Sequence, residues 1–181
     1  MTRQHLSTIA IGVLVLASTT PRAQAQTTAP GPYYATPSWD MTLPTNTRFI
    51  VLSNFNNAAV LDRETGLVWE RFPTQVPFEW ELAAAICTTR QIANRFGWRL
   101  PTIHELSSLI DAGQPFPSEP LNNTFGALVF NAYWSTTNLA RLPSFAYVAD
   151  LRTSALSVID KSTSLGVGWL CVRGGGGADG Q

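Results

Sequence analysis

Residues 98–111, WRLPTIHELSSLID, predict the fold more completely than any other stretch of the chain. Pro101 disfavours helix for the residue that precedes it. Thr102 and Glu105 have the T-x-x-E spacing of a capping box, so we expect a helix to begin at Ile103. The apolar residues that follow recur at helical spacing on one face: Ile103, Leu106, Leu109 and Ile110. The stretch therefore predicts an extended segment and then a short capped helix that packs on a hydrophobic core.

The first 25 residues have the pattern of a secretory signal peptide. Arg3 and His5 precede an apolar run at residues 6–17, and Ala23-Gln24-Ala25 is an A-x-A cleavage pattern. Because this run is shorter than the roughly 20 residues that span a bilayer, we expect cleavage before Gln26 rather than a membrane anchor. The chain is therefore predicted to be exported to the periplasm or the cell exterior, with no membrane span after cleavage.

Length and charge limit the kind of protein and the kind of partner. A chain of 181 residues with 45% hydrophobic residues is typical of one globular domain with a sizeable core. Removing residues 1–25 takes Arg3 and Arg22 from the 12 basic residues and none of the 12 acidic ones, which leaves a formal charge of −2. Nucleic-acid binding needs concentrated positive charge, so this balance argues against it.

The chain has two cysteines, Cys87 and Cys171. In an oxidising compartment we expect them to form a disulfide. The alternative is a catalytic thiol, which needs a base to lower its pKa, and His104 is the only histidine after residue 25. Zinc binding has little support because there is no C-x-x-C motif and only this one histidine.

Hydrophobic patterning in the first half of the chain predicts three strands followed by a helix. Residues 26–47 are rich in proline and are interpreted as a linker or arm. We expect a hairpin from residues 48–52 and 58–62, a further strand at 67–70, and a helix from Phe78 to about Arg95. The helix places Cys87 on or beside its buried face. Three charged residues near these strands are interpreted as serving solubility: Arg63, Glu64 and Glu70.

The second half predicts strands around a long irregular region. Residues 112–132 contain several prolines, and loops of this length are usually functional or mobile, so they form the first candidate binding region. Three side chains there are weak calcium candidates, with turn capping as the alternative interpretation: Glu119, Asn122 and Asn123. Antiparallel strands are expected at residues 133–137, 145–151 and 155–159, with a last strand at 168–173 and a flexible tail at 176–181. The order of elements is that of an α+β fold.

Five sequence landmarks resemble the Lcl C-terminal domain family of bacterial exported proteins. They are TGLVWE at residues 65–70, the helix with Trp80 and Cys87, WRLPTxxEL at 98–106, YWSTT at 133–137, and CVRGG at 171–175. The resemblance covers about residues 48–175. It implies a C-type-lectin-like fold, related to that of the formylglycine-generating enzyme, with two helices on twisted antiparallel sheets. It also implies a disulfide from the helix to the last strand, which matches Cys87 and Cys171.

Three functions are compatible with these features. The first is a non-catalytic, adhesin-like recognition module that binds a glycan or a cell-surface or envelope protein. Its candidate ligand-binding residues are three aromatic and three basic side chains: Tyr133, Trp134, Trp169, Arg99, Arg141 and Arg152. The alternative for the aromatic residues is a place in the core, and for Arg99 an ion pair with Glu105 or Asp111.

The other two functions are an envelope subunit and an enzyme. A structural subunit of an envelope assembly would use residues 26–47 to dock on a partner. An enzyme of the formylglycine-generating type would need reactive cysteines, whereas the two in this chain are expected to be bridged. We therefore expect a protein that is not an enzyme and has no cofactor, with calcium as the only candidate.

Overall fold

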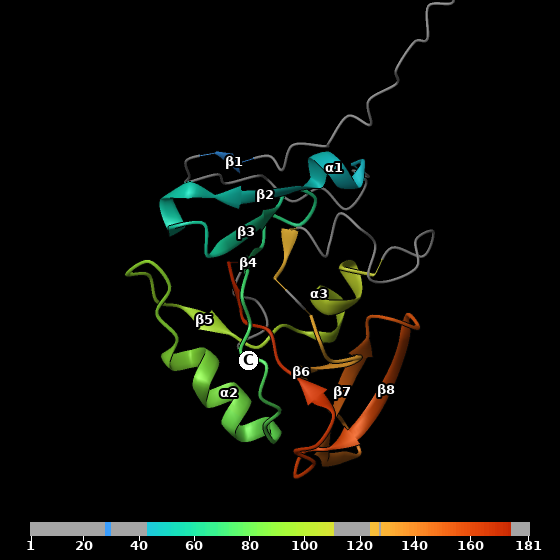
Figure 1. Ribbon diagram of the computed structural model, residues 1–181. Coiled ribbons are helices and arrows are strands. Elements are labelled where there is room, and N and C mark those ends of the chain that lie inside the picture. Colours follow the sequence, from blue (N-terminus) through green and yellow to red (C-terminus); the bar gives the residue numbers. More distant parts are fainter. Residues whose placement is uncertain (1–27, 30–42, 111–123, 127, 175–181) are drawn as a thin grey trace, which may run out of the picture.

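The computed structural model describes residues 28–29, 43–110, 124–126 and 128–174 (Figure 1). The predicted signal peptide, the C-terminal tail and the calcium candidates Glu119, Asn122 and Asn123 lie outside these ranges. In chain order the described elements are β1 (Thr28–Ala29), α1 (Thr45–Arg48), β2 (Phe49–Leu52), the 3₁₀ helix η1 (Ser53–Phe55), β3 (Ala59–Asp62), β4 (Val68–Glu70), α2 (Trp80–Thr89), β5 (Trp98–Arg99), α3 (Ile103–Ser108), β6 (Ala132–Leu139), β7 (Leu142–Asp150), β8 (Ala155–Asp160), β9 (Val167–Gly168) and β10 (Val172–Arg173).

Six strands form the first sheet, in the order β1-β2-β3-β4-β10-β5. The predicted hairpin is confirmed as the antiparallel pair β2 and β3, and β4 continues the sheet. Every residue of β2 and β3 is buried. Alternate side chains belong to two separate cores, with Ile50 and Leu61 on one face and Val51 and Val60 on the other. Burial on both faces explains why these strands are almost continuously apolar.

The second sheet has the order β8-β7-β6-β9. The three predicted antiparallel strands are confirmed as β6, β7 and β8. The prediction of one last strand at residues 168–173 is wrong, because this segment divides between the sheets. Val167–Gly168 pairs with β6, whereas Val172–Arg173 pairs with β4 and β5. The residues between, Trp169 to Cys171, are buried because they cross from one sheet to the other through the core.

The helix α3 confirms the capping-box prediction. The Glu105 backbone N–H donates to Thr102 Oγ1 at 3.2 Å, and the Thr102 N–H donates to Glu105 Oε2 at 2.8 Å. The predicted apolar face packs on the second sheet, with Ile103 and Leu106 buried. Local sequence therefore sets both the start and the orientation of this helix.

The helix α2 is shorter than predicted. It ends at Thr89 rather than near Arg95, because Arg90 has an extended backbone (ψ 136°), and Ala93 and Asn94 have positive φ of 48° and 60°. The buried face of the helix includes Ala83 and Cys87, whereas Gln91 lies beyond the helix and is exposed. Figure 1 shows α2 beside β5, so this early end turns the chain back toward the first sheet.

The architecture is α+β, with two longer helices against two mostly antiparallel sheets. Part of the segment interpreted as a linker or arm belongs to the sheet, since Thr28–Ala29 pairs with β2 in parallel. Of the predicted binding loop at residues 112–132, the structure describes residues 124–126 and 128–132, of which Thr124 and Phe125 are buried.

Candidate functional site

The three aromatic site candidates lie in the core. Tyr133 and Trp169 are 1% exposed and Trp134 is 0% exposed, so none presents a ring face to solvent. The indole N–H of Trp134 donates to the Phe78 carbonyl at 2.9 Å, and that of Trp169 donates to the Val76 carbonyl at 3.0 Å. The two indole rings thus hold the segment before α2 in place, and all three aromatic residues have the core position considered as their alternative.

The three arginine candidates are not brought together. Arg99 donates to both carboxylate oxygens of Glu105, at 2.7 and 2.6 Å, and to the Gly174 carbonyl at 3.1 Å. Its expected ion pair with Glu105 is therefore confirmed. Arg141 and Arg152 are exposed, but they flank opposite ends of β7. These residues do not form one site.

A pair that the sequence analysis did not single out joins β4, an inner strand of the first sheet, to the end of α2. Glu70 ends β4 with 2% of its side chain exposed, and it forms an ion pair with Arg90, which follows α2 and is 28% exposed. The interpretation of Glu70 as a solubility residue is therefore wrong. The arginine also lies over the Trp169 ring, 5.7 Å from its centroid.

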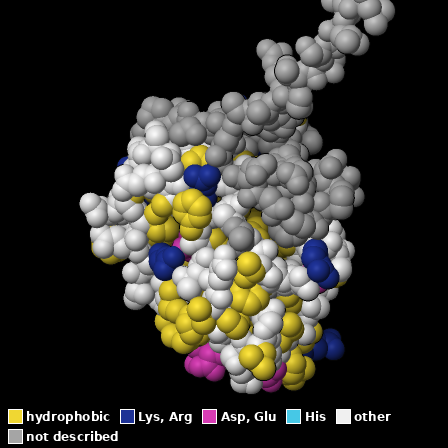
Figure 2. All heavy atoms as spheres, in the orientation of Figure 1, with side chains coloured by type: hydrophobic (Ala, Val, Ile, Leu, Met, Phe, Trp, Pro, Cys, Tyr) yellow, Lys and Arg dark blue, Asp and Glu magenta, His cyan; other side chains and the backbone are white. Residues whose placement is uncertain are grey.

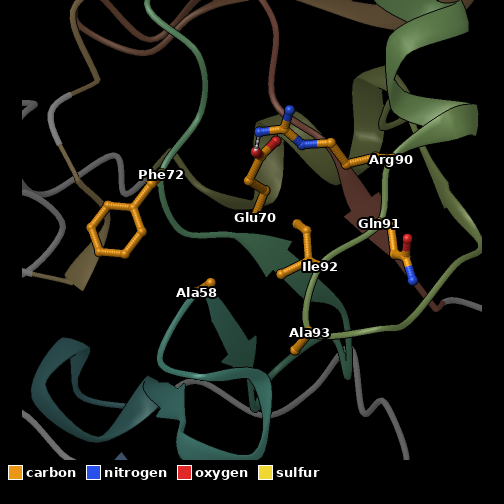
Figure 3. A pocket seen from close by; sticks show the side chains of 7 residues that line it. All are labelled: Ala58, Glu70, Phe72, Arg90, Gln91, Ile92 and Ala93. Carbon is orange, nitrogen blue, oxygen red and sulfur yellow. Dashed lines mark hydrogen bonds and ion pairs between the residues drawn. The ribbon is translucent and has the colours of Figure 1, made fainter.

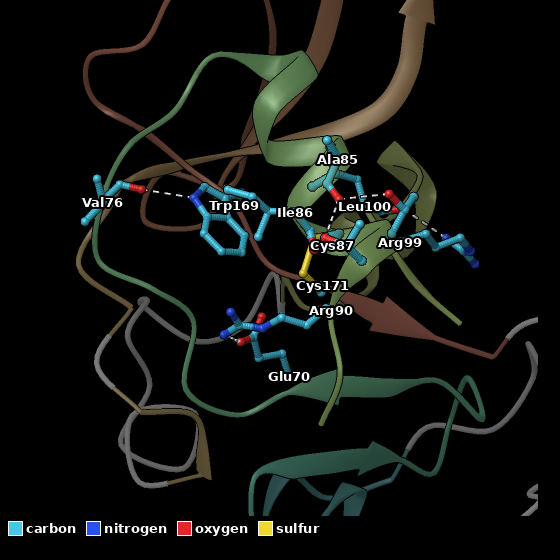
Figure 4. Close-up of a disulfide and its surroundings, with 12 residues drawn as sticks. Glu70, Val76, Ala85, Ile86, Cys87, Arg90, Arg99, Leu100, Trp169 and Cys171 are labelled. Atoms are coloured by element: carbon cyan, nitrogen blue, oxygen red, sulfur yellow. Dashed lines mark hydrogen bonds and ion pairs between the residues drawn. A yellow bond between two sulfur atoms is a disulfide. The ribbon is translucent and has the colours of Figure 1, made fainter. Parts of the chain in front are cut away.

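The disulfide positions both members of the pair. As predicted, a disulfide joins Cys87 in α2 to Cys171, the residue before β10 (Figure 4). The Arg90 N–H donates to the Cys87 carbonyl at 3.1 Å, and the Glu70 N–H donates to the Cys171 carbonyl at 2.9 Å. Each charged residue is thus bonded through its backbone to one half-cystine, so the bridge fixes the distance between β4 and the end of α2.

The hydrogen bonding of Glu70 is incomplete. Burial raises the pKa of its carboxyl group above the ordinary value of 4.5, and the Arg90 charge and the Cys171 backbone act in the opposite direction. Within the described residues, its Oε2 atom is buried and has no hydrogen-bond partner. An unpaired buried carboxylate oxygen costs free energy, so this position needs an explanation other than stability.

A pocket of about 250 Å³ opens beside this pair. Figure 3 shows Glu70 and Arg90 pointing toward each other, with Phe72 on the opposite side of the pocket from Gln91. The full lining consists of four mainly apolar and three polar residues: Ala58, Phe72, Ile92, Ala93, Glu70, Arg90 and Gln91. Phe72 is 54% exposed, which is unusual for so large an apolar residue. The pocket therefore combines an aromatic wall with hydrogen-bonding groups.

The face of the molecule drawn in Figure 2 is mixed in character. Figure 2 shows hydrophobic side chains interspersed with basic ones on the face in view. The guanidinium group of Arg71 lies over the Phe72 ring at 4.9 Å and donates to the Thr124 and Asn57 carbonyls. Arg71 thus holds the ring in place, although its own charge is engaged with backbone oxygens.

Two further properties concern metals and membranes. Across the described ranges, no group of three or more histidine, cysteine, aspartate or glutamate side chains is placed to hold a metal ion. In the same ranges, no helix has the length and apolar character needed to cross a bilayer.

The sequence contained only a weak signal for this pocket. Glu70 follows the buried Trp69, and Arg90 lies near the end of an amphipathic helix, where a basic residue usually complements the helix dipole. Nothing local indicates that the two residues meet, because they are brought together by the disulfide and by β10.

Comparison with protein families identifies a domain that covers more than half of the chain. Residues 58–173 match the family model described as the Lcl C-terminal domain. That range contains Glu70, Arg90, both cysteines and all seven residues that line the pocket. No curated protein matches the chain.

Proposed function

Because the chain belongs to the Lcl C-terminal domain family, we propose that it is an exported, non-catalytic recognition module that binds a glycan or a protein ligand. The observation that supports this most directly is the open pocket beside Glu70 and Arg90, with its exposed aromatic wall. Concave sites that combine apolar walls with a few convergent polar groups are the usual places of ligand binding.

The proposal includes a C-type-lectin-like fold. It is supported by two helices against two mostly antiparallel sheets, and by a disulfide from the longest helix to the residue before the final strand. The same disulfide supports export, since structural disulfides persist mainly in oxidising compartments. The pattern of a signal peptide in residues 1–25 agrees with this location.

Binding without catalysis is supported by the residue types at the pocket. The seven lining residues contain no serine, threonine, cysteine or histidine, and their one carboxylate, that of Glu70, is ion-paired with Arg90. Both cysteines of the chain are consumed by the disulfide, whereas chemistry of the formylglycine-generating type relies on reactive thiols. The proposed function needs no cofactor. Running the binding screen with calcium and with chelator tests whether binding depends on calcium.

A screen of the oxidised protein on immobilised glycans and on extracellular proteins tests this function, run once with calcium and once with chelator. The variant is Arg90→Ala, and the matched control is Arg63→Ala, which removes an arginine that does not line the pocket. We expect specific binding that the Arg90 variant loses and the Arg63 variant keeps. Absence of saturable binding to either class of ligand would contradict the proposed function, and binding that both variants retain would contradict the assignment of this pocket as the binding site.

A further inference from the structure

We propose that the pocket beside Glu70 and Arg90 is a subsite for one uncharged sugar residue, whose hydroxyl groups bond to the polar side chains and whose apolar face packs on Phe72. This inference rests on the proposed recognition function and narrows its ligand class. It follows from the charge balance of the pocket, its free hydrogen-bonding groups and its size.

Charge balance argues against an ionic ligand. Among the lining residues, Glu70 is the only acid and Arg90 the only base, and they are paired with each other. A further cation, Arg71, lies over the Phe72 ring, and its Nε and Nη1 atoms donate to backbone carbonyls. A sulfate or carboxylate group would have to displace Glu70 from Arg90, and an ammonium group would have to displace Arg90 from Glu70. Either exchange leaves a buried charge without its partner, which is costly.

The hydrogen-bonding groups that remain favour hydroxyls. Glu70 Oε2 has no partner among the described residues, and within the same residues the Arg90 side chain donates to Glu70 through Nη2. The Gln91 amide has a single long contact of 3.5 Å, to Asn94. A hydroxyl group can accept from a guanidinium or amide N–H and donate to a carboxylate or amide oxygen. Neighbouring hydroxyls of one sugar therefore match the donors and the acceptors that this pocket offers.

The apolar wall and the volume fit one ring. Phe72, Ile92 and the two alanines provide a surface against which the C–H face of a sugar can pack. At about 250 Å³ the pocket is smaller than the roughly 300–1,000 Å³ of sites for drug-sized ligands, so it suits a single end group. A wholly apolar occupant fits less well, because it would bury the polar groups without hydrogen bonds.

The position of the aromatic wall depends on Gly126. A Cβ atom at that position would lie 2.5 Å from Cδ1 of Phe72, closer than such contacts occur. Replacing Gly126 by alanine therefore has to shift the ring while every polar group of the pocket is retained. This variant separates the contribution of the ring's position from that of the hydrogen bonds.

The test is an NMR titration of the oxidised protein at neutral pH with three matched probes: a methyl glycoside, the corresponding methyl uronide and the corresponding amino sugar. We expect the neutral glycoside to bind, with about tenfold weaker affinity in Arg90→Ala and Phe72→Ala. Phe96→Ala is the control, because Phe96 is 60% exposed and does not line the pocket. It should bind as the wild type does.

The Glu70→Gln variant tests the charge balance of the pocket most directly. This change leaves Arg90 as the only charged group in the lining, so the preference should move from the neutral glycoside toward the uronide by about tenfold. Uniform loss of binding to all probes, together with a wild-type folding transition, would overturn the assignment of Glu70 as the charge-balancing group.

The outcomes distinguish this inference from the broader function. Tighter binding of the uronide or the amino sugar by the wild type overturns the neutral-sugar assignment and leaves the recognition function intact. Glycoside binding that persists unchanged in both Arg90→Ala and Phe72→Ala overturns the location. If no probe binds and the screen on glycans and extracellular proteins also finds no ligand, both the subsite and the recognition function fail.

Discussion

The first sheet holds two buried acid–arginine pairs on neighbouring strands, and they differ in how completely the acid is satisfied. Asp62, at the end of β3, is fully buried and accepts hydrogen bonds on both oxygens. Its partners are the Arg48 guanidinium, the Glu64 backbone N–H and the Thr65 hydroxyl. Glu70, at the end of β4, is nearly as buried but uses one oxygen only.

The difference separates a structural pair from a candidate binding pair. Arg48 also donates to the Ser108 carbonyl, at 2.8 Å, and so ties α1 and β3 to the end of α3. Arg90 instead stands beside a pocket and is more exposed than Arg48, at 28% against 11%. A satisfied network stabilises the fold, whereas an incomplete one at a pocket has bonding capacity left for a ligand.

The largest effect is expected where the disulfide that supports the second pair is removed. The double substitution Cys87→Ser and Cys171→Ser opens a loop with a sequence separation of 84 residues. In the entropic account this costs about 4 to 5 kcal/mol in the free energy of unfolding. Urea denaturation of the variant against the oxidised wild type measures it. A loss below about 1 kcal/mol would show that the bridge does not hold β4 and α2 together.

Breaking the satisfied pair should cost somewhat less. Asp62→Asn removes one of the two carboxylates that compensate Arg48, while the ion pair with Glu64 at 3.0 Å remains. We expect it to lower the free energy of unfolding by about 2 kcal/mol, because the charge-assisted hydrogen bonds to a buried carboxylate are weakened. Equilibrium unfolding checks this value. The comparison fails if Asp62→Asn is no more destabilising than Glu70→Gln in the same assay.

A smaller change removes one hydrogen bond from Asp62, so that this carboxylate is less completely satisfied, as Glu70 is. Thr65→Ala takes away the hydroxyl that donates to Asp62 Oδ2 at 2.8 Å, while the arginine contacts remain. We expect a loss of about 1 kcal/mol, the usual worth of one hydrogen bond to a buried group. Thermal unfolding at neutral pH is sensitive enough to detect it. Thr47→Ala is the control, because the hydroxyl of this exposed threonine donates to the local Pro44 carbonyl.

The smallest effect, and the one most specific to the second pair, is a pH dependence. Because burial raises the folded-state pKa of Glu70 above 4.5, the folded state binds its proton more tightly than the unfolded state does. The stability that this group contributes is therefore complete below its unfolded pKa and is lost as the pH rises through its folded pKa. We expect the wild type to lose stability relative to Glu70→Gln as the pH increases from about 4 to neutral. If the stability of the wild type relative to Glu70→Gln stays constant or increases as the pH rises, the raised pKa is contradicted.

Sequence predicted the parts of the fold that are determined locally. The capping box of Thr102 and Glu105 predicts where α3 begins. The alternation of side chains along each strand predicts the antiparallel strands β6, β7 and β8. Two cysteines in a chain with an export pattern predicted the disulfide. These features need only neighbouring residues or a count of residue types.

The parts that sequence did not predict depend on contacts between distant segments. The helix α2 ends early because Arg90 leaves the helix to meet Glu70 and Ile92 returns to the core. The last strand is divided because residues 169–171 cross between the sheets. The pocket arises from β4, the end of α2 and the segment after it, so no single stretch contains its signal.

The most direct test of the contrast between the two pairs follows the side-chain Nε–Hε NMR signals of Arg90 and Arg48 in one sample during titration with a methyl glycoside. The account predicts a saturable shift of the Arg90 signal and an unchanged Arg48 signal, because only the first guanidinium has free bonding capacity beside the pocket. An unchanged Arg90 signal at probe concentrations that saturate binding elsewhere on the protein would contradict it.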